Sequence, residues 1–177
     1  MDNILRAQKL VWPLRPLIHI DHKFDTESLY NEYSKNRDKF ANHTDIPKEY
    51  EDGFKDFKIL RANDDSLPVL LNECREFINK YNLQGHDIRP RYYVCEAGGY
   101  FPPHIDMKTL CAVNHILSDS CAPLIIEKKE YQYKTAVFNT QRMHNVQNSG
   151  YGDRVLIKLS FFDLSYEEVV TRLQQHP

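Results

Sequence analysis

The chain has 177 residues, of which 41% are hydrophobic, so it is long enough for one folded domain with a sizeable core. Acidic and basic residues are mixed and the formal net charge is −2, which gives no electrostatic reason to expect nucleic acid or a membrane surface as a partner. The N-terminus lacks the basic start and apolar block of a secretory signal, and no apolar run has the length of a membrane span. We therefore expect a single cytoplasmic domain over residues 1–177.

The four cysteines are expected to be reduced and structural. No two of them have the Cys-x-x-Cys spacing that is typical of zinc and redox sites. Cys74 falls on an apolar helical stripe, which favours packing over chemistry. The other three are Cys95, Cys111 and Cys121.

The N-terminal part of the chain is predicted to be an arm followed by a helix. Two prolines interrupt the apolar residues of 9–20, which fits an edge strand or an extended arm better than a helix. Over residues 24–41 the apolar spacing becomes helical, and Asp25 or Thr26 can cap the helix. The apolar stripe of this helix comprises Leu29, Tyr33 and Phe40.

A polar stretch over residues 42–65 predicts a long surface loop with one short strand at Phe57–Leu60. Either a solvated loop or part of a substrate lid would explain its length. The next segment, Leu67 to Tyr81, has the clearest helical spacing in the chain. Ser66 can cap this helix and Gly85 can end it. Its apolar stripe comprises Leu70, Leu71, Cys74, Phe77, Ile78 and Tyr81.

From Ile88 onward, short runs of β-branched and aromatic residues alternate with turn-forming residues. The predicted strands are Arg91–Cys95, Thr109–Leu117, Pro123–Glu127, Thr135–Asn139, His144–Gln147 and Arg154–Phe162. In the last strand, alternate residues form an apolar face that can pack on helices, and the others form a face that can line a cavity. The apolar face comprises Val155, Ile157, Leu159 and Phe161, and the other comprises Arg154, Leu156, Lys158 and Ser160. Several short strands with a helical layer predict an α+β protein built on a sandwich or a jelly-roll barrel.

The tail, residues 164–177, is predicted to be a structural helix. Ser165 and Glu168 have the spacing of a capping box, and Leu164 is placed to contact Val169.

Three His-x-Asp triplets occur in the chain, and their context separates them. In a strand, residues i and i+2 point to the same side, so a triplet can offer one imidazole and one carboxylate to one metal ion. His43-Thr44-Asp45 lies in the predicted loop, and His19-Ile20-Asp21 lies just before a helix start. His104-Ile105-Asp106, in contrast, is followed by His144 in a predicted strand. Two histidines and a carboxylate leave coordination positions open, which suits non-haem Fe(II) that must bind a cosubstrate and O2.

Arg154 extends this pattern. The turn over residues 148–153 predicts a hairpin that brings Arg154 to the strand next to His144. An arginine there offers a planar pair of donors for a dicarboxylate whose other end chelates the metal. A cation that points inward from a strand is costly without such a partner.

The series His104, Asp106, His144 and Arg154 resembles the Fe(II)- and 2-oxoglutarate-dependent oxygenases. Within that superfamily, residues 102–104, the strand with His115 and residues 138–154 look like the aspartyl/asparaginyl β-hydroxylase-like branch. The resemblance covers about residues 88–163. It implies a double-stranded β-helix core (jelly-roll, cupin-like) over 88–163. We expect the N-terminal helices of the supporting region 1–87 to pack on one sheet of this core, because their apolar stripes need a partner surface.

By that resemblance, iron would be bound by His104, Asp106 and His144, and 2-oxoglutarate by Arg154 and His115. Two positions depart from the branch. The vertebrate-type enzymes lack the carboxylate that Asp106 supplies, and Val113 stands where they have an arginine. Lys158 could supply a second positive charge, although a surface lysine would also explain it.

The resemblance implies a dioxygenase that hydroxylates an unactivated carbon and produces succinate and CO2. Its cofactors would be Fe(II), 2-oxoglutarate and O2, with ascorbate as an optional reductant. The expected substrate is an amino-acid side chain, either free or in a peptide or protein. No feature of the sequence indicates an oligomeric state.

The sequence disfavours nucleic acid as the substrate. The nucleic-acid demethylases carry a second arginine six residues after the first, where this chain has Ser160, and the chain lacks a basic footprint for phosphates. Two alternatives of a different class stay open. One is a non-catalytic jelly-roll protein that binds a metal or another ligand, and the other is a metal-dependent hydrolase that uses the same ligands.

Overall fold

The structure is a computed structural model that describes residues 15–42, 55–61, 67–119 and 122–176. The helices are α1 (Thr26–Lys35), the 3₁₀ helix η1 (Arg37–Lys39), α2 (Pro68–Lys80) and α3 (Tyr166–Gln175). The first strands are β1 (Leu17–His19), β2 (Ala41–Asn42), β3 (Lys55–Arg61), β4 (Ile88–His104) and β5 (Cys111–Ile116). They are followed by β6 (Leu124–Ile126), β7 (Lys129–Tyr131), β8 (Thr135–Phe138), β9 (His144–Gln147) and β10 (Arg154–Phe161).

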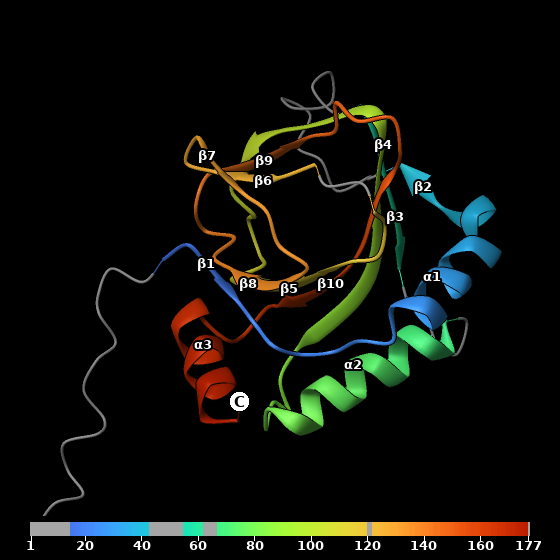
Figure 1. Cartoon of the computed structure of the whole chain (residues 1–177). Helices are drawn as coiled ribbons and strands as arrows, with labels where there is room; N and C mark the ends of the chain where they lie inside the picture. Colours follow the sequence, from blue (N-terminus) through green and yellow to red (C-terminus); the bar gives the residue numbers. More distant parts are fainter. Residues whose placement is uncertain (1–14, 43–54, 62–66, 120–121, 177) are drawn as a thin grey trace, which may run out of the picture.

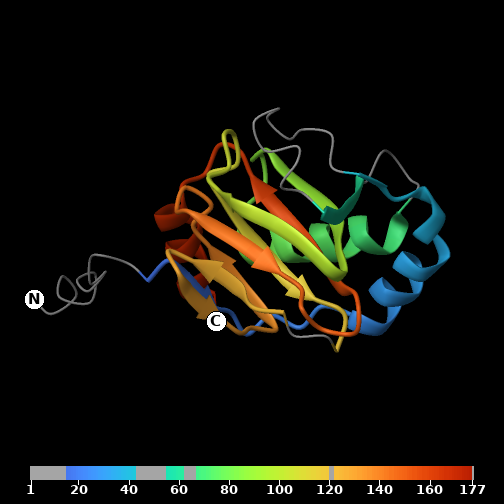
Figure 2. The ribbon, with the colours of Figure 1, turned by 90° about the horizontal axis from the view of Figure 1, so that it is seen from above.

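The ten strands of the described residues form one antiparallel sheet that curls into a nearly closed barrel, and the helices lie outside it (Figures 1 and 2). The strand order is β1-β8-β5-β10-β4-β9-β6-β7, and β3 pairs with β2 and β4. This arrangement is a jelly roll and confirms the predicted α+β fold class. No helix of the described residues is long and apolar enough to cross a membrane.

Strand β10 separates two apolar clusters, because it lies between β4 and β5 and its side chains alternate between the two faces. Outside the barrel, its predicted apolar face packs against residues of the helices. These outer residues include Val155, Ile157, Leu159 and Phe161 from β10, Leu70 and Phe77 from α2, and Val169 and Val170 from α3. Inside the barrel, Leu156 packs with Tyr93 and Phe138. The predicted division of this strand into two faces is therefore confirmed.

Helix α1 is shorter than the predicted 24–41. Asp25 caps its start, since Oδ1 accepts a hydrogen bond of 3.0 Å from the backbone N–H of Ser28. The helix ends at Asn36, where polar residues follow and offer nothing to bury. Phe40 lies in extended backbone beyond η1, yet its ring still contacts Tyr33 at 5.4 Å.

Helix α2 confirms the predicted helix over Leu67 to Tyr81. The N-cap is Leu67, which has no side-chain capping bond, and the predicted cap Ser66 lies outside the described residues. The side chain of Glu32 in α1 instead accepts the hydrogen bonds of the backbone N–H groups in the first turn of α2. At the other end, Asn82 takes the left-handed conformation (φ 52°), and the N–H of the next residue, Leu83, bonds back into the helix. The helix thus ends before Gly85.

Three strand features were not predicted, and the first is the two-residue strand β2, where the end of a helix and the start of a loop were expected. Strand β7 follows a tight turn at Glu127 and Lys128, both with positive φ, where the usual Asn or Gly is missing. Strand β4 extends far beyond the predicted Arg91–Cys95 and shifts its register in its second half. Because that half contains prolines and glycines, the sequence pattern did not indicate a strand there. Other strands, among them β9 and the short strand within β3, follow the prediction.

The tail and the thiols follow the prediction where they are described. Ser165 and Glu168 form both bonds of a capping box at the start of α3. Leu164 and Val169 are buried in the outer cluster. Cys74 and Cys111 are buried thiols, and Cys95 is buried as well, whereas Cys121 lies outside the described residues.

Candidate metal centre

The two histidines of the candidate site face each other across neighbouring strands. His104 ends β4 and His144 begins β9, and the pairing of these strands places the two residues directly opposite. Opposite residues share a face of a sheet, and the two imidazole rings lie 4.2 Å apart. Asp106 lies two residues past the end of β4. Its backbone N–H donates to Thr140 O, and its carbonyl accepts from Gln141 Nε2 at 2.8 Å.

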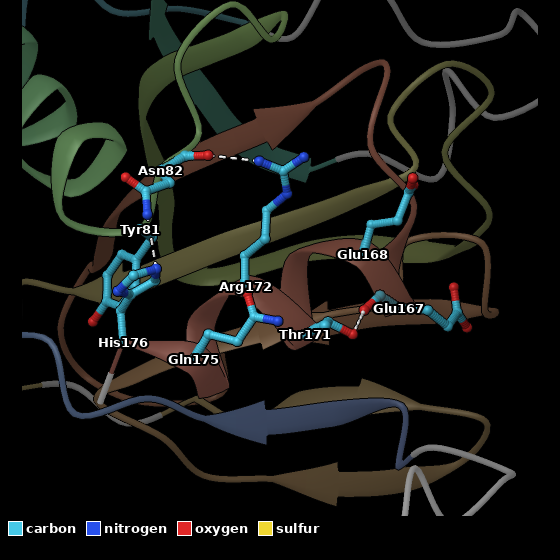
Figure 3. Close-up of a pocket in the computed structure, with 8 residues that line it drawn as sticks. All are labelled: Tyr81, Asn82, Glu167, Glu168, Thr171, Arg172, Gln175 and His176. Carbon is cyan, nitrogen blue, oxygen red and sulfur yellow. Dashed lines mark hydrogen bonds between the residues drawn. The ribbon is translucent and has the colours of Figure 1, made fainter. Parts of the chain in front are cut away.

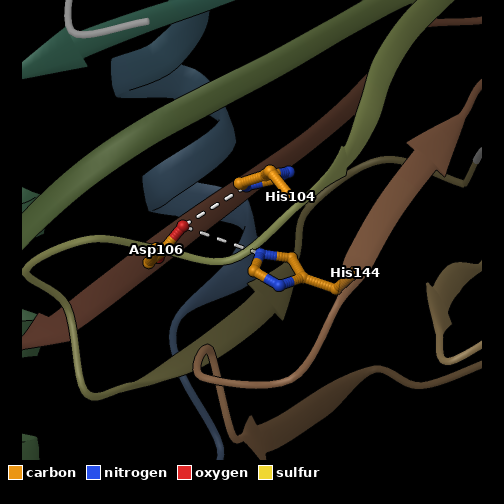
Figure 4. A group of neighbouring side chains, drawn as sticks. All are labelled: His104, Asp106 and His144. Carbon is orange, nitrogen blue, oxygen red and sulfur yellow. Dashed lines mark ion pairs between the residues drawn. The ribbon is translucent and has the colours of Figure 1, made fainter. Parts of the chain in front are cut away.

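The three predicted ligands converge on one point (Figure 4). Oδ1 of Asp106 is 3.3 Å from Nε2 of His104 and 3.7 Å from Nε2 of His144. The side chains of these residues are 15%, 11% and 4% exposed, respectively. Within the described ranges, no other three His, Cys, Asp or Glu side chains gather in this way. His19-Ile20-Asp21 therefore forms no such group, and His43-Thr44-Asp45 lies outside the described residues.

The hydrogen bonds of the two imidazoles fit a metal ion. Nδ1 of His104 bonds to the carbonyl of Pro102, and Nδ1 of His144 bonds to the carbonyl of Arg142, each at 2.8 Å. A carbonyl can only accept, so each Nδ1 carries the hydrogen and each Nε2 presents a lone pair. Both nitrogens face a carboxylate oxygen, an arrangement that is favourable only with a proton or a metal cation between them. The donor set of two nitrogens and one oxygen suits a divalent metal ion.

The electrostatics also favour the forms that bind metal, neutral imidazole and ionised carboxylate. Burial lowers the pKa of His144 to about 4, so the ring stays neutral. Burial alone would raise the pKa of Asp106, but the ammonium of Lys158 is the largest of the effects that oppose burial, and the net pKa lies below its usual range.

Lys158 is mostly buried, so its interpretation as a surface lysine is wrong. Its Nζ donates to Oδ2 of Asp106 at 3.0 Å, and its side chain is 13% exposed. Burial lowers the pKa of Lys158, whereas Asp106 and Tyr93 raise it, and the net pKa lies above the usual value. Aromatic rings surround the group, with Nζ 5.5 Å from the ring centre of Tyr93 and 5.7 Å from that of Phe138.

Arg154 faces the inside of the barrel, on the same side of β10 as Lys158, and is 2% exposed. Its Nε donates to Ala122 O at 2.9 Å, and Nη2 donates to the hydroxyl of Tyr133 at 2.7 Å. Within the described part of the chain, no carboxylate pairs with this cation. The Tyr133 hydroxyl also accepts from Asn114 Nδ2 at 3.0 Å. Sequence reasoning missed Tyr133 and Asn114, which carry no motif of their own.

The predicted hairpin between His144 and Arg154 is wrong in one respect. Strands β9 and β10 are not neighbours, because β4 lies between them and pairs with both. The turn is held by Asn148, whose Nδ2 donates to the carbonyls of Cys95, Glu96 and Gly152. The two functional residues thus flank the strand that carries His104.

His115 is not part of the centre. It lies opposite Ile157, which packs in the outer cluster, whereas its neighbour Asn114 lies opposite Lys158. Its two ring nitrogens bond to the hydroxyls of Thr26 (2.9 Å) and Thr135 (2.7 Å). Since His115 is on the helix side of β5, this placement corrects the expectation that it contacts the cosubstrate.

A cleft of about 430 Å³ lies elsewhere, between the end of α2 and helix α3 (Figure 3). Its polar groups bond to one another, as in the contact from Arg172 Nη1 to Asn82 O and that between Asn82 and His176. None of the predicted site residues lines it. The residues that line this cleft supply no group to the metal centre.

No family model and no curated protein match the sequence. Among solved structures, the chain is similar to a prolyl-4-hydroxylase from Pseudomonas putida, with a TM-score of 0.55 and 12% identity over 77% of this chain and 84% of that chain. It is also similar to a cupin 2 conserved barrel domain protein from Rhodopseudomonas palustris, with a TM-score of 0.44 and 9% identity over 68% of this chain and 67% of that chain. The first likeness shows a shared fold, the double-stranded β-helix, and at this identity it shows the fold alone.

Proposed function

We propose that this protein is an Fe(II)- and 2-oxoglutarate-dependent dioxygenase that hydroxylates an unactivated carbon of an amino-acid side chain, free or in a polypeptide, and produces succinate and CO2. The observation that carries the proposal is the convergence of two Nε2 lone pairs and one carboxylate oxygen in a buried site. Such a set leaves positions open for a cosubstrate and O2. The fold shared with a prolyl-4-hydroxylase supports a hydroxylase.

In this proposal, His104 and His144 would hold the metal through Nε2 and Asp106 through Oδ1. Bound Fe(II) would supply the activation of O2 that couples oxidation of 2-oxoglutarate to hydroxylation. The carbonyls of Pro102 and Arg142 keep both rings in the tautomer that binds metal. The ring of Phe101 packs edge-on against that of His104, with the ring centres 4.0 Å apart.

Arg154 would hold the distal carboxylate of 2-oxoglutarate. Of its five N–H groups, the described residues accept from Nε and Nη2, so further donors stay available to a dianion. The hydroxyl of Tyr133 fixes the orientation of the guanidinium. A buried cation without a carboxylate partner among the described residues supports this role.

The test is an anaerobic titration of the Fe(II)-loaded protein with 2-oxoglutarate, followed by the visible charge-transfer band of a chelated keto acid. The band should appear in the wild type. Arg154→Ala should raise the concentration needed for it by roughly 10- to 100-fold, as expected for the loss of hydrogen bonds to a charged group. Iron affinity should change far less. Arg89→Ala, which removes an exposed arginine of β4, is the matched control and should titrate like the wild type.

Equal 2-oxoglutarate affinity in Arg154→Ala and wild type would remove the role assigned to this residue. Iron binding without any band would favour a metal-binding jelly roll or a hydrolase instead. Where the band appears, succinate formation with amino acids and peptides should be measured next, since this identifies the substrate class.

A further inference from the structure

Lys158 lies on a strand of the barrel, whereas Asp106, which accepts its hydrogen bond, lies on a loop. Lys158 lies in the middle of β10, where it is paired with Arg91 of β4 on one side and Asn114 of β5 on the other. Its backbone is therefore fixed by the barrel. Asp106 lies beyond the end of β4, on a segment without strand pairing. A ligand on such a segment needs support from the rigid scaffold to keep its geometry.

The two carboxylate oxygens of Asp106 have different surroundings. Oδ1 lies within 3.7 Å of both imidazole Nε2 atoms, and Oδ2 accepts from Nζ of Lys158 at 3.0 Å. The ring centres of Tyr93 and Phe138 lie 5.5 Å and 5.7 Å from the ammonium nitrogen, within the range of favourable cation–π contact. One oxygen is thus reserved for the ammonium, and the other is turned toward the histidines.

We propose that Lys158 is a positioning residue of the metal centre, which holds Oδ2 of Asp106 and so makes the carboxylate a ligand through Oδ1 alone. A second carboxylate oxygen on the metal would use a coordination position that a cosubstrate needs. Lys158 thereby keeps that position open. The inference rests on metal binding by the triad, which is part of the proposed function, and is independent of 2-oxoglutarate and O2.

Co(II) is a suitable probe, because its visible absorption depends on the number and geometry of its ligands. Lys158→Met keeps the length and the apolar stem of the side chain and removes the donor. Its Co(II) spectrum should differ from that of the wild type in band position and intensity, because Oδ2 becomes free to bind the metal. Lys158→Arg keeps a cationic donor and should restore the spectrum toward that of the wild type.

The control is Lys35→Met, which removes the same charge from the exposed end of α1 and should leave the spectrum unchanged. A Lys158→Met spectrum that superimposes on that of the wild type overturns the proposal, even if this variant also binds 2-oxoglutarate less tightly. Failure of the wild type to bind Co(II) would overturn metal binding by the triad as well. The two failures are therefore distinguishable.

If Lys158→Met does not fold, as judged by circular dichroism, the wild type itself provides the test. In protein labelled with ¹⁵N-lysine, the Nζ resonance of Lys158 should be broadened by Co(II) and not by Zn(II), because it lies next to a metal ligand. An Nζ signal that stays sharp with Co(II) bound would contradict the proposal.

Discussion

His115 is a buried neutral histidine, and its acid titration should cost stability. Burial lowers its pKa to about 4, with smaller contributions from Lys134 and His22. An unfolded histidine takes up a proton near pH 6.5, whereas the folded His115 stays neutral down to about pH 4. Its contribution to stability is therefore complete above pH 6.5 and is lost as the pH falls toward 4.

From this residue alone, the free energy of unfolding should be about 2 kcal/mol lower at pH 5 than at pH 7. Urea unfolding of the wild type and His115→Gln, at both pH values and with a metal chelator present, measures the effect. Glutamine does not titrate but can still bond to a hydroxyl, so the variant should lose less stability between pH 7 and pH 5. The same pH dependence in both proteins would contradict this account.

The sequence spacing of the three candidate metal ligands correctly predicted that their side chains come together. His104, Asp106 and His144 come together as expected, because their spacing along strands fixes which side chains can meet. The face on which His115 lies could not be read in the same way. All residues of β5 are buried on both sides, so burial gives no alternation to follow. Only its pairing with β10 decides the face.

At the scale of elements, one buried carboxylate joins both helices of the N-terminal layer to the barrel. Glu32 of α1 accepts hydrogen bonds from the backbone N–H groups of Val69 (2.8 Å) and Leu70 (3.0 Å) in the first turn of α2. It also accepts from the hydroxyl of Tyr92 in β4 at 2.8 Å. Glu32 therefore does for α2 what a local N-cap side chain does elsewhere.

Glu32→Ala should lower the free energy of unfolding by about 3 kcal/mol, because it leaves buried donors without an acceptor. Glu27→Ala, in the exposed first turn of the same helix, is the control and should cost well under 1 kcal/mol. Chemical denaturation of the two variants tests the difference. Equal losses would mean that solvent satisfies the N–H groups of α2.

The sequence predicted elements best where local residues decide them. The capping box at Ser165 and the two-faced strand β10 depend on near neighbours and were found. The start of α2 depends on Glu32, which is remote in sequence, so no local signal indicated its contribution. The turn before β7 uses residues that seldom adopt positive φ, so no turn signal marked it.

At the scale of the whole molecule, the fold class followed from the order of helices and strands, but the strand order did not. A short turn between β9 and β10 suggests a hairpin locally. Closure of the barrel instead inserts β4 between them, and β4 is long enough to pair with β10 in its first half and β9 in its second. Such a pairing depends on the complete sheet and leaves no local trace in the sequence.

Because the barrel must close to bring the metal ligands together, metal binding reports on the formation of the whole fold. The ligands come from the end of β4 and the start of β9, so they meet only in the folded chain. A metal that binds the folded state alone, at a concentration 100 times its Kd, adds about 2.7 kcal/mol to stability. For a domain of this size, that corresponds to a rise in Tm of roughly 5–10 °C.

Thermal unfolding with and without Co(II) should therefore show this rise in the wild type and none in His144→Ala, which lacks one ligand. His19→Ala removes the histidine of another His-x-Asp triplet and should respond like the wild type. A rise that persists in His144→Ala would show that the metal binds elsewhere. A loss of the rise in a folded His19→Ala variant would show that His19 of β1 contributes to metal binding, contrary to the site assigned to His104, Asp106 and His144.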